Sequence, residues 1–300
     1  MKKLIYALLI IAVIVLAGCS KKNSEVAYGT ITATEYHPAS EVSGKIISFQ
    51  KGEGDKVEEN EIIAIIDTTD IQLQINEMEA AIELKKLMTR NRDNELAILA
   101  QEQENLAVDI DRFTKLTAAE AAPEKNLDDL NASAKVLNLK VQSARLAHLS
   151  SEKETELAQI KLQQLEAKKT KFFLKSPIKG TLLNTYFSAG EIVPAGKPYA
   201  KIADLEIMTA KVYISETQLP EITLGKEVVL GIDTPNGGSS YILSHVTNIA
   251  HQAEFTPKII QTKEQRVKLV YEVEVECYNE RGELKIGMPV TMFLDLPNEK

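Results

Sequence analysis

Residues 71–172 constrain the fold of this 300-residue chain more than any other segment. This stretch contains no glycine and only one proline, Pro123, close to its middle. Proline lacks an amide hydrogen and clashes with the preceding helical turn, so it interrupts a helix. The composition therefore predicts two long helices joined by a short turn at about residues 118–126.

Both predicted helices carry an apolar seam with the alternating steps of three and four residues that are typical of coiled coils. Nine of fourteen positions are apolar in the first seam, which is Ile71, Ile75, Met78, Ile82, Lys85, Thr89, Arg92, Leu96, Leu99, Gln103, Leu106, Ile110, Phe113 and Thr117. Ten of fourteen are apolar in the second, which is Leu127, Leu130, Ala134, Leu137, Val141, Ala144, His148, Ser151, Thr155, Ala158, Leu162, Leu165, Lys169 and Phe172. Helices of about 70 Å joined by a short turn fold back on each other, which predicts an antiparallel coiled-coil hairpin over residues 70–172.

Polar residues interrupt both seams near their middles. The first break is Lys85, Thr89 and Arg92, and the second is His148, Ser151 and Thr155. Folding the chain about a point near residue 121 brings the two breaks level. We therefore expect a register that keeps Arg92 within two turns of Ser151, and a polar middle between two apolar segments.

The first twenty residues have the layout of a bacterial secretory leader. Two lysines precede an apolar run at residues 4–16, and two small residues then precede Cys19. The stretch Leu16-Ala17-Gly18-Cys19 resembles the lipobox of bacterial lipoproteins, which implies a signal peptide at 1–18 and acylation of Cys19. Residues 19–38 are then the lipid anchor, a linker and a first strand. The alternative is an uncleaved anchor, although the run is short for a membrane span of about 20 residues.

A gapless internal repeat flanks the predicted hairpin at an offset of 136 residues. It aligns Val42 with Ile178, Gly44 with Gly180, Ile46 with Leu182, Ile47 with Leu183, Gly54 with Gly190, Asp55 with Glu191, Val57 with Val193, Ala64 with Ala200 and Ile66 with Ile202. Each half, at 39–69 and 173–204, is too small to bury a face alone. We expect the halves to pack into one β-sandwich from which the hairpin projects.

Residues 205–297 show strand patterns separated by turn signals. Strands are expected at 212–214, 227–232, 241–249, 268–277 and 290–296, with glycine or asparagine between them. This spacing predicts a small antiparallel β-barrel. The predicted fold class is therefore multidomain α+β, with a helical hairpin inserted in a split β-sandwich and a barrel after it.

The two half-sandwiches resemble the split biotinyl/lipoyl-like domain. The residues that carry this resemblance are Val42-Ser43-Gly44-Lys45-Ile46 and Gly54-Asp55-Lys56-Val57, then Pro177-Ile178-Lys179-Gly180 and Gly190-Glu191-Ile192-Val193. True carrier domains hold their modified lysine on the turn between the halves. The hairpin replaces that turn in this chain, so we expect no cofactor.

The anchor, hairpin, split domain and barrel together resemble the periplasmic adaptors, also called membrane fusion proteins of the HlyD type. The resemblance covers nearly the whole mature chain. It implies a non-enzymatic, homo-hexameric subunit of a tripartite efflux or secretion system, lipid-anchored to the inner membrane in the periplasm. Its implied partners are an inner-membrane transporter and a TolC-like outer-membrane channel. The residues Glu254-Phe255-Thr256-Pro257-Lys258, Gln261-Thr262, Arg266 and Leu269-Val270-Tyr271 resemble a signature of adaptors that serve ABC-type exporters.

Adaptors of this family dock the hairpin tip onto the outer channel through an Arg-x-x-x-Leu-x6-Ser motif. Arg112 and Leu116 match its first two positions, but Pro123 stands where the serine belongs. The resemblance implies that Arg112 donates to acceptors on the channel rim and that Leu116 fills a groove between its helices. The alternative is that Arg112 lies on a solvated face and that Pro123 only begins the second helix, where proline is favoured.

The sequence carries no familiar catalytic or metal motif. We find no Walker A, Gly-x-Ser-x-Gly or His-Glu-x-x-His sequence, and no paired-cysteine spacing. The closest histidines, His245 and His251, would lie about 20 Å apart on one strand, too far to share an ion unless the chain turns. Cys277 has no partner once Cys19 is acylated, which favours a buried, inert thiol.

Charge and architecture narrow the function classes further. The net charge of −8 argues against a nucleic-acid partner, because phosphate binding needs a basic face. Two other classes stay open beside the adaptor. One is a carrier subunit of a biotin- or lipoate-dependent enzyme, and the other is a non-transport envelope scaffold lipoprotein with a coiled-coil interaction arm.

Overall fold

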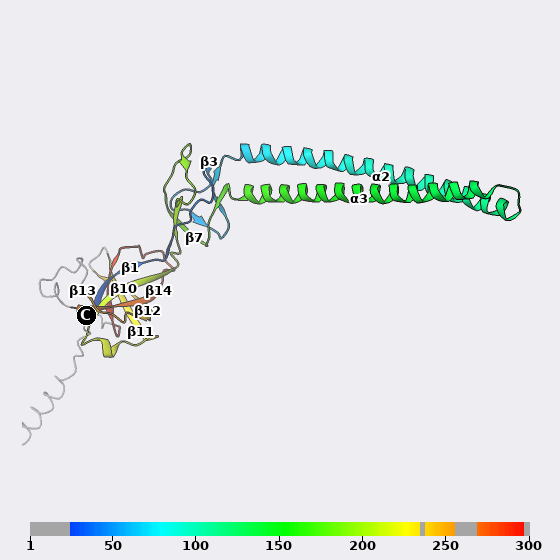
Figure 1. The fold of residues 1–300 in the computed structure, drawn as a ribbon. Helices are drawn as coiled ribbons and strands as arrows, with labels where there is room; N and C mark the ends of the chain where they lie inside the picture. The colour runs from blue at the N-terminus through cyan, green and yellow to red at the C-terminus, as the bar shows by residue number, and fades with distance from the viewer. Residues whose placement is uncertain (1–24, 235–237, 256–268, 297–300) are drawn as a thin grey trace, which may run out of the picture.

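Three bodies follow one another along the molecule (Figure 1). A computed structural model describes residues 25–234, 238–255 and 269–296. A long helical rod leaves one side of a central β-sandwich, and a β-barrel lies on the other side. The expected signal peptide and Cys19 lie outside the described residues, as does most of the segment that resembles the ABC-exporter signature.

Helices α2 (Thr69–Ala118) and α3 (Glu124–Thr170) form the predicted hairpin. Both are rich in alanine, leucine, glutamate and lysine, which have high helix propensity. Pro123 is the N-cap residue of α3, with a φ of −65° that its ring already favours. Glu120 takes a left-handed φ of 58° in the turn. At roughly 1.5 Å per residue, the 50 residues of α2 make an arm about 75 Å long.

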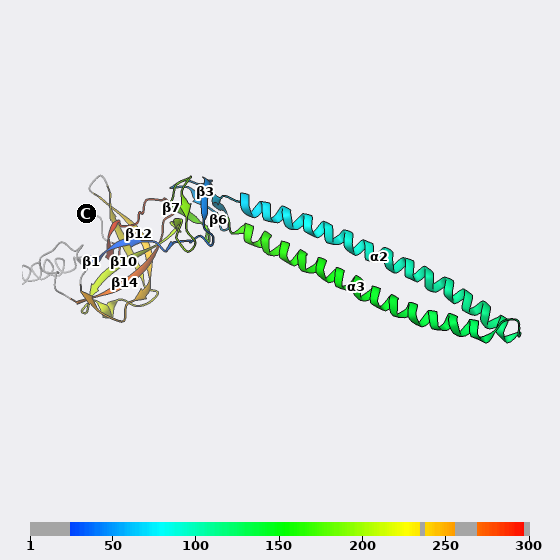
Figure 2. The same cartoon turned by 45° about the horizontal axis from the view of Figure 1, so that its top comes forward.

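The predicted seams form the contact between the two helices. Every position of the second seam, and every position of the first except Arg92, is at least partly buried. Three hydrogen-bonded pairs link the arms at different heights, namely Lys169 with Gln72 at 2.6 Å, Thr89 with Ser151 at 2.9 Å, and Gln103 with Asn138 at 2.6 Å. In each pair the two residue numbers average close to 120, as expected for arms that fold back near residue 121. The predicted register is therefore confirmed. The arms run side by side over their whole length (Figure 2).

The sandwich consists of two four-stranded sheets that exchange strands between the halves. The sheet orders are β2-β9-β7-β4 and β6-β5-β3-β8. The strands are β2 (Glu35–Tyr36), β3 (Gly44–Phe49), β4 (Lys56–Val57), β5 (Ile62–Ile66), β6 (Phe173–Lys175), β7 (Gly180–Thr185), β8 (Ile192–Val193) and β9 (Ala200–Ala203). Strand β4 pairs with β7 and β8 pairs with β3, each from the other half. Because both halves supply one common core, their predicted packing into a single sandwich is confirmed.

The internal repeat is visible as a pseudo-two-fold relation. The amide of Gly54 donates to the carbonyl of Leu182, and the amide of Gly190 donates to the carbonyl of Ile46, both at 2.8 Å. The two glycines have φ values of 91° and 95°, which residues with a Cβ rarely adopt. The pseudo-two-fold relation makes the end of β5 equivalent to the end of β9. The chain enters the hairpin after β5 and the barrel after β9. The rod and the barrel therefore point away from each other (Figure 1).

Six strands close the barrel, and one of them comes from the N-terminal segment. The order is β10-β1-β15-β11-β12-β14, and β14 pairs back with β10. The strands are β1 (Glu25–Thr32), β10 (Ile207–Ser215), β11 (Glu227–Asp233), β12 (Ser239–Ile249), β14 (Leu269–Tyr278) and β15 (Pro289–Phe293). The short strand β13 (Glu254–Phe255) pairs with β14, and a 3₁₀ helix, η1 (Leu219–Glu221), links β10 to β11. The sequence predicted a barrel from residues 205–297 alone and did not place the first strand in it.

Candidate functional site: the hairpin and its tip

The hairpin tip carries the three predicted docking residues. Arg112 and Leu116 lie in the last two turns of α2, and Pro123 precedes the first turn of α3. The Arg112 side chain is 61% exposed and forms an ion pair with Asp109, one turn earlier on the same helix. Leu116 is 38% exposed. The fold therefore brings these residues to one end of the rod, and Pro123 also begins the second helix as the alternative interpretation expects.

Small side chains cover the end of the rod. Ala118, Ala119 and Ala121 are exposed in the turn, beside Pro123. The Thr117 hydroxyl, shielded from solvent at the last position of the first seam, has no hydrogen-bond partner among the described residues. A surface of small residues lets another polypeptide approach the backbone closely.

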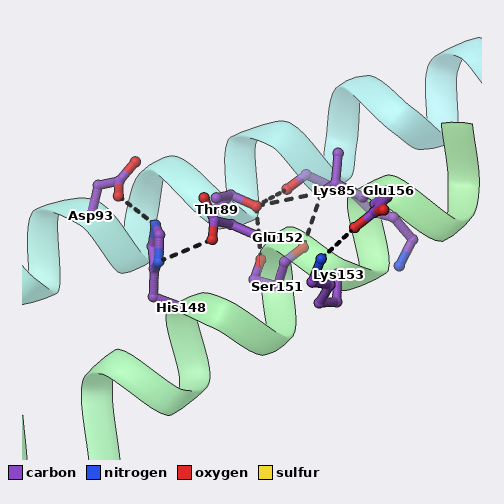
Figure 3. Close-up of polar contacts among 9 residues, drawn as sticks. Lys85, Thr89, Asp93, His148, Ser151, Glu152, Lys153 and Glu156 are labelled. Carbon is purple, nitrogen blue, oxygen red and sulfur yellow. Dashed lines mark hydrogen bonds and ion pairs between the residues drawn. The ribbon is translucent and has the colours of Figure 1, made fainter. Parts of the chain in front are cut away.

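The polar middle of the hairpin is confirmed by a cluster of hydroxyl groups between the arms (Figure 3). The Oγ1 atom of Thr89 lies 2.9 Å from the Oγ of Ser151 and 3.5 Å from the Oγ1 of Thr155. Arg92 turns away from the seam and pairs with Glu95 on its own helix. The seam pattern located this break, and the hydroxyl groups satisfy each other there.

Charged groups flank the hydroxyl cluster on both sides. The Nε2 atom of His148 lies 2.7 Å from the Oδ1 of Asp93 across the seam, and its Nδ1 lies 3.8 Å from the Oε2 of Glu152 (Figure 3). Lys85 and Glu154 form a second cross-arm ion pair at 2.9 Å. The seam pattern in the sequence marks His148 and Lys85 as breaks but does not reveal their acidic partners. Those partners lie outside the seam, and they could have been found by laying the two arms in register.

Each arm also carries an exposed apolar stripe on the side away from the seam. The stripe residues are Leu73, Leu84, Leu87, Ile98 and Val108 on α2, and Val136, Leu139, Leu146, Leu157 and Ile160 on α3, all 45–69% exposed. Within each stripe the residues fall on heptad positions c and f, two of the positions that a coiled coil turns outward. The sequence shows the seams clearly but not these stripes, because the charged residues between the stripe positions obscure their spacing.

The barrel carries one charged cluster among its described residues, in which Lys211 pairs with Glu272 at 2.8 Å and with Glu274 at 3.1 Å. Cys277 is fully buried, and burial raises the pKa of its thiol to about 11, as the predicted inert thiol requires. Among the described residues, no three His, Cys, Asp or Glu side chains gather closely enough to hold a metal ion. No helix in the described part of the chain is long and apolar enough to cross a membrane.

Comparison with known proteins identifies relatives along the whole chain, although no family model matches it. A UPF0194 membrane protein of Acidithiobacillus ferridurans is 24% identical over 330 aligned positions, covering 98% of this chain and 96% of the relative. A UPF0194 membrane protein of Yersinia enterocolitica is 27% identical over 328 positions, covering 97% and 98%.

Solved structures share the architecture at low sequence identity. MacA from Actinobacillus actinomycetemcomitans superposes with a TM-score of 0.64 at 21% identity, covering 93% of this chain and 82% of MacA. A MacA–MexA chimeric protein gives 0.52 at 22% identity, covering 91% of this chain and 82% of the chimera. A membrane fusion protein from Streptococcus pneumoniae gives 0.50 at 18%, covering 90% and 97%. This chain therefore has the fold of the periplasmic adaptors, or membrane fusion proteins.

Proposed function

We propose that this chain is the adaptor subunit of a tripartite efflux or secretion system. In this role it links an inner-membrane transporter, of the ABC type, to a TolC-like outer-membrane channel, and it adds no catalysis. One observation carries the proposal: a rod of about 75 Å leaves the sandwich on the side opposite the barrel. The barrel end and the tip can thus contact two different partners at the same time.

The proposed anchor fits the direction of the first strand. Strand β1 starts at Glu25, six residues after Cys19, and runs toward the sandwich, since β2 follows it there. A lipid on Cys19 thus holds the outer end of the barrel at the inner membrane and leaves the tip pointing into the periplasm. Mass spectrometry of the mature N-terminus tests this, and a peptide that retains residues before Cys19 contradicts it.

The tip proposal assigns Arg112 and Leu116 to the contact with the outer channel. Both side chains are exposed, and the Arg112 guanidinium can exchange its ion pair with Asp109 for acceptors on the channel rim. A photo-crosslinking residue in place of Lys115 should capture the channel in intact cells, and the same residue in place of Lys153, mid-rod, should not. Arg112→Asp should abolish both capture and export. Unchanged capture and export in this variant would refute the docking role.

The exposed stripes support side-by-side packing of several copies into a ring. In the observed register Leu84 of α2 and Leu157 of α3 lie at the same height, so parallel copies can set one stripe against the other. We expect six copies, as the family resemblance implies. Native mass spectrometry of the detergent-purified full chain tests the number, and a strictly monomeric protein contradicts the ring.

Two other function classes would require different structural features. A scaffold lipoprotein shares the anchor and the rod but has no use for a split sandwich. A biotin or lipoate carrier needs a lysine-bearing turn between its halves, and here α2 and α3 occupy the connection between β5 and β6. Copurification of a membrane transporter with the tagged chain favours the adaptor, whereas capture of envelope structural proteins alone favours the scaffold.

A further inference from the structure

We propose that the apolar side chains of Phe255 and Leu269, at the outer end of the barrel, insert into the surface of the membrane that holds the lipid anchor. This inference rests on the proposed function for the anchor, and it adds a second, non-covalent contact between the chain and the lipid. It is carried by the exposure and pairing of the two side chains, by their level in the barrel, and by the place where the N-terminal segment joins the barrel.

Phe255 and Leu269 form an exposed apolar pair on two neighbouring strands. They lie directly opposite each other in the antiparallel pairing of β13 with β14, so their side chains share one face of this two-stranded ribbon. Phe255 is 76% exposed and Leu269 is 55% exposed. Residues 256–268, which join the two strands, are not part of the proposed site. The ribbon therefore presents two large apolar side chains to the surroundings at one point.

The apolar pair continues the interior row of the barrel past the end of the barrel. Alternate residues of a strand lie on the same face, and Val273 and Val275 of β14 are fully buried in the barrel core. Tyr271 is partly buried and packs against that core, whereas Leu269, the next residue of the row, is exposed. The row of apolar side chains therefore extends beyond the core, and its last member is open to the surroundings.

The apolar pair lies level with the residue at which the N-terminal segment enters the barrel. Strand β10 pairs with β1 on one side and with β14 on the other. Continuing the two registers to Glu216, one residue past the end of β10, places Glu25 and Leu269 opposite it. Figure 1 shows β13 at the end of the barrel that is away from the sandwich. The pair and the start of β1 are therefore at the same end of the barrel.

The chain before Glu25 brings this end of the barrel close to lipid. Glu25 lies six residues after Cys19, and such a segment spans at most about 20 Å even when it is fully extended. The acylated Cys19 of the proposed anchor lies at the membrane surface. The bilayer is therefore within reach of the apolar pair.

The size and charge of this surface favour lipid over a protein partner. Two side chains are far fewer than the roughly 20 residues that each side of a specific protein interface contributes. A bilayer needs no complementary surface, and the strength of binding scales with the apolar area that enters it. Glu216 and Glu254, beside the pair, are exposed and acidic, so they do not attract anionic headgroups. We therefore expect an apolar insertion that does not require anionic lipid.

Tryptophan fluorescence in vesicles tests the insertion, because the chain contains no tryptophan of its own. The full-length lipidated protein is reconstituted into phosphatidylcholine vesicles whose acyl chains are brominated near the headgroup, since bromine quenches nearby indole rings. Phe255→Trp and Leu269→Trp are compared with Ile192→Trp, a control position in the sandwich that is 68% exposed. For rings at the boundary of headgroups and acyl chains, we expect bromination to lower the fluorescence of both barrel variants about two- to threefold and to leave the control unchanged.

The outcomes separate this inference from the anchor. A protein that does not float with the vesicles refutes the lipid anchor and the insertion together. A protein that floats but shows the same quenching in all three variants keeps the anchor and overturns the insertion. Quenching that requires added phosphatidylglycerol also overturns it, because the attraction is then electrostatic. A blue-shifted emission of Phe255→Trp without quenching means that a protein surface covers the pair, which overturns lipid as the partner.

Discussion

At the residue scale, Gly29 is a position at which a side chain would prevent strand β1 from pairing with β10 in the barrel. Gly29 lies on β1 opposite Val212 of β10. A Cβ atom at Gly29 would lie 2.0 Å from the carbonyl oxygen of Lys211 and 2.7 Å from the Cα of Val212. Because both neighbours are backbone atoms, space can be made only by opening the pairing between β1 and β10.

Gly29→Ala should therefore lower the free energy of unfolding by about 2 kcal/mol. Gly52→Ala serves as the control, because a Cβ there would meet only the Asp55 side chain at 3.7 Å, and we expect a change within about 0.5 kcal/mol. Urea denaturation of both variants measures the difference. Equal midpoints would mean that β1 does not pass this close to β10 in solution.

Alkaline pH should destabilise the protein through two buried acids. Burial raises the pKa of the Cys277 thiol from 9.0 to about 11 and that of the Tyr199 phenol from 10.0 to about 12, because a buried anion loses its hydration. The unfolded chain releases these protons at lower pH than the folded one, so stability falls as the pH rises through 9 to 12. The melting temperature should drop less between pH 8.5 and 10.5 in Cys277→Ala than in the wild type. An identical drop in both proteins would contradict a buried thiol.

At the scale of the element, each helix of the hairpin has two apolar faces with different roles. Leu137 on the α3 seam is 4% exposed, whereas Leu139, two residues later on the outward stripe, is 66% exposed. Two steps along a helix turn a side chain to the opposite face. Substituting the two leucines one at a time therefore separates the contribution of the hairpin contact to stability from the contribution of contacts with other copies to assembly.

Leu137→Ala should lower the free energy of unfolding by about 2 to 3 kcal/mol, because it leaves a cavity in the seam. Leu139→Ala should change the unfolding of the monomer by less than about 0.5 kcal/mol but should weaken assembly, since its stripe is proposed to face a neighbouring copy. Thermal unfolding by circular dichroism and mass photometry supply the two readouts. If Leu139→Ala assembles as well as the wild type, the stripe is not the contact between copies.

At the scale of the whole molecule, the pseudo-symmetry of the sandwich sets the direction of both attachments. The equivalent ends of β5 and β9 lead to the rod and to the barrel, which places the two on opposite sides (Figure 1). The buried cores of the sandwich and the barrel contain no residue of α2 or α3. The length of the rod can therefore be changed without disturbing either core.

Deletion of residues 83–96 together with residues 145–158 should give a folded protein with a shorter rod. Each deletion removes two heptads, so the seams stay in phase, and the two segments lie level with each other. The tip should then fall short by about 21 Å, and export should stop while the melting temperature stays at or above that of the wild type. Deleting residues 83–96 alone misaligns the arms and should destabilise the hairpin. Normal export by the matched double deletion would argue against a spanning role.

The sequence by itself determined the rod, its register and the split sandwich. A heptad seam is a local pattern, and two polar breaks at equal distances from residue 120 leave one way to align the arms. The gapless repeat likewise identified the matching halves. The sequence also singled out Arg112, Leu116 and Pro123, and their contact with a channel stays a prediction.

Only the tertiary structure decided which strands and which side chains meet. Strand β1 joins β10 and β15 far along the chain, and β4 and β8 change places between the halves. Strands in which apolar and polar residues alternate resemble one another in sequence. The local sequence of a strand therefore does not identify a pairing partner that lies far along the chain. In the same way, the sequence marked His148 as a seam break but did not pair it with Asp93. That contact exists only because two separately formed helices pack in a particular register, which brings together groups 55 residues apart.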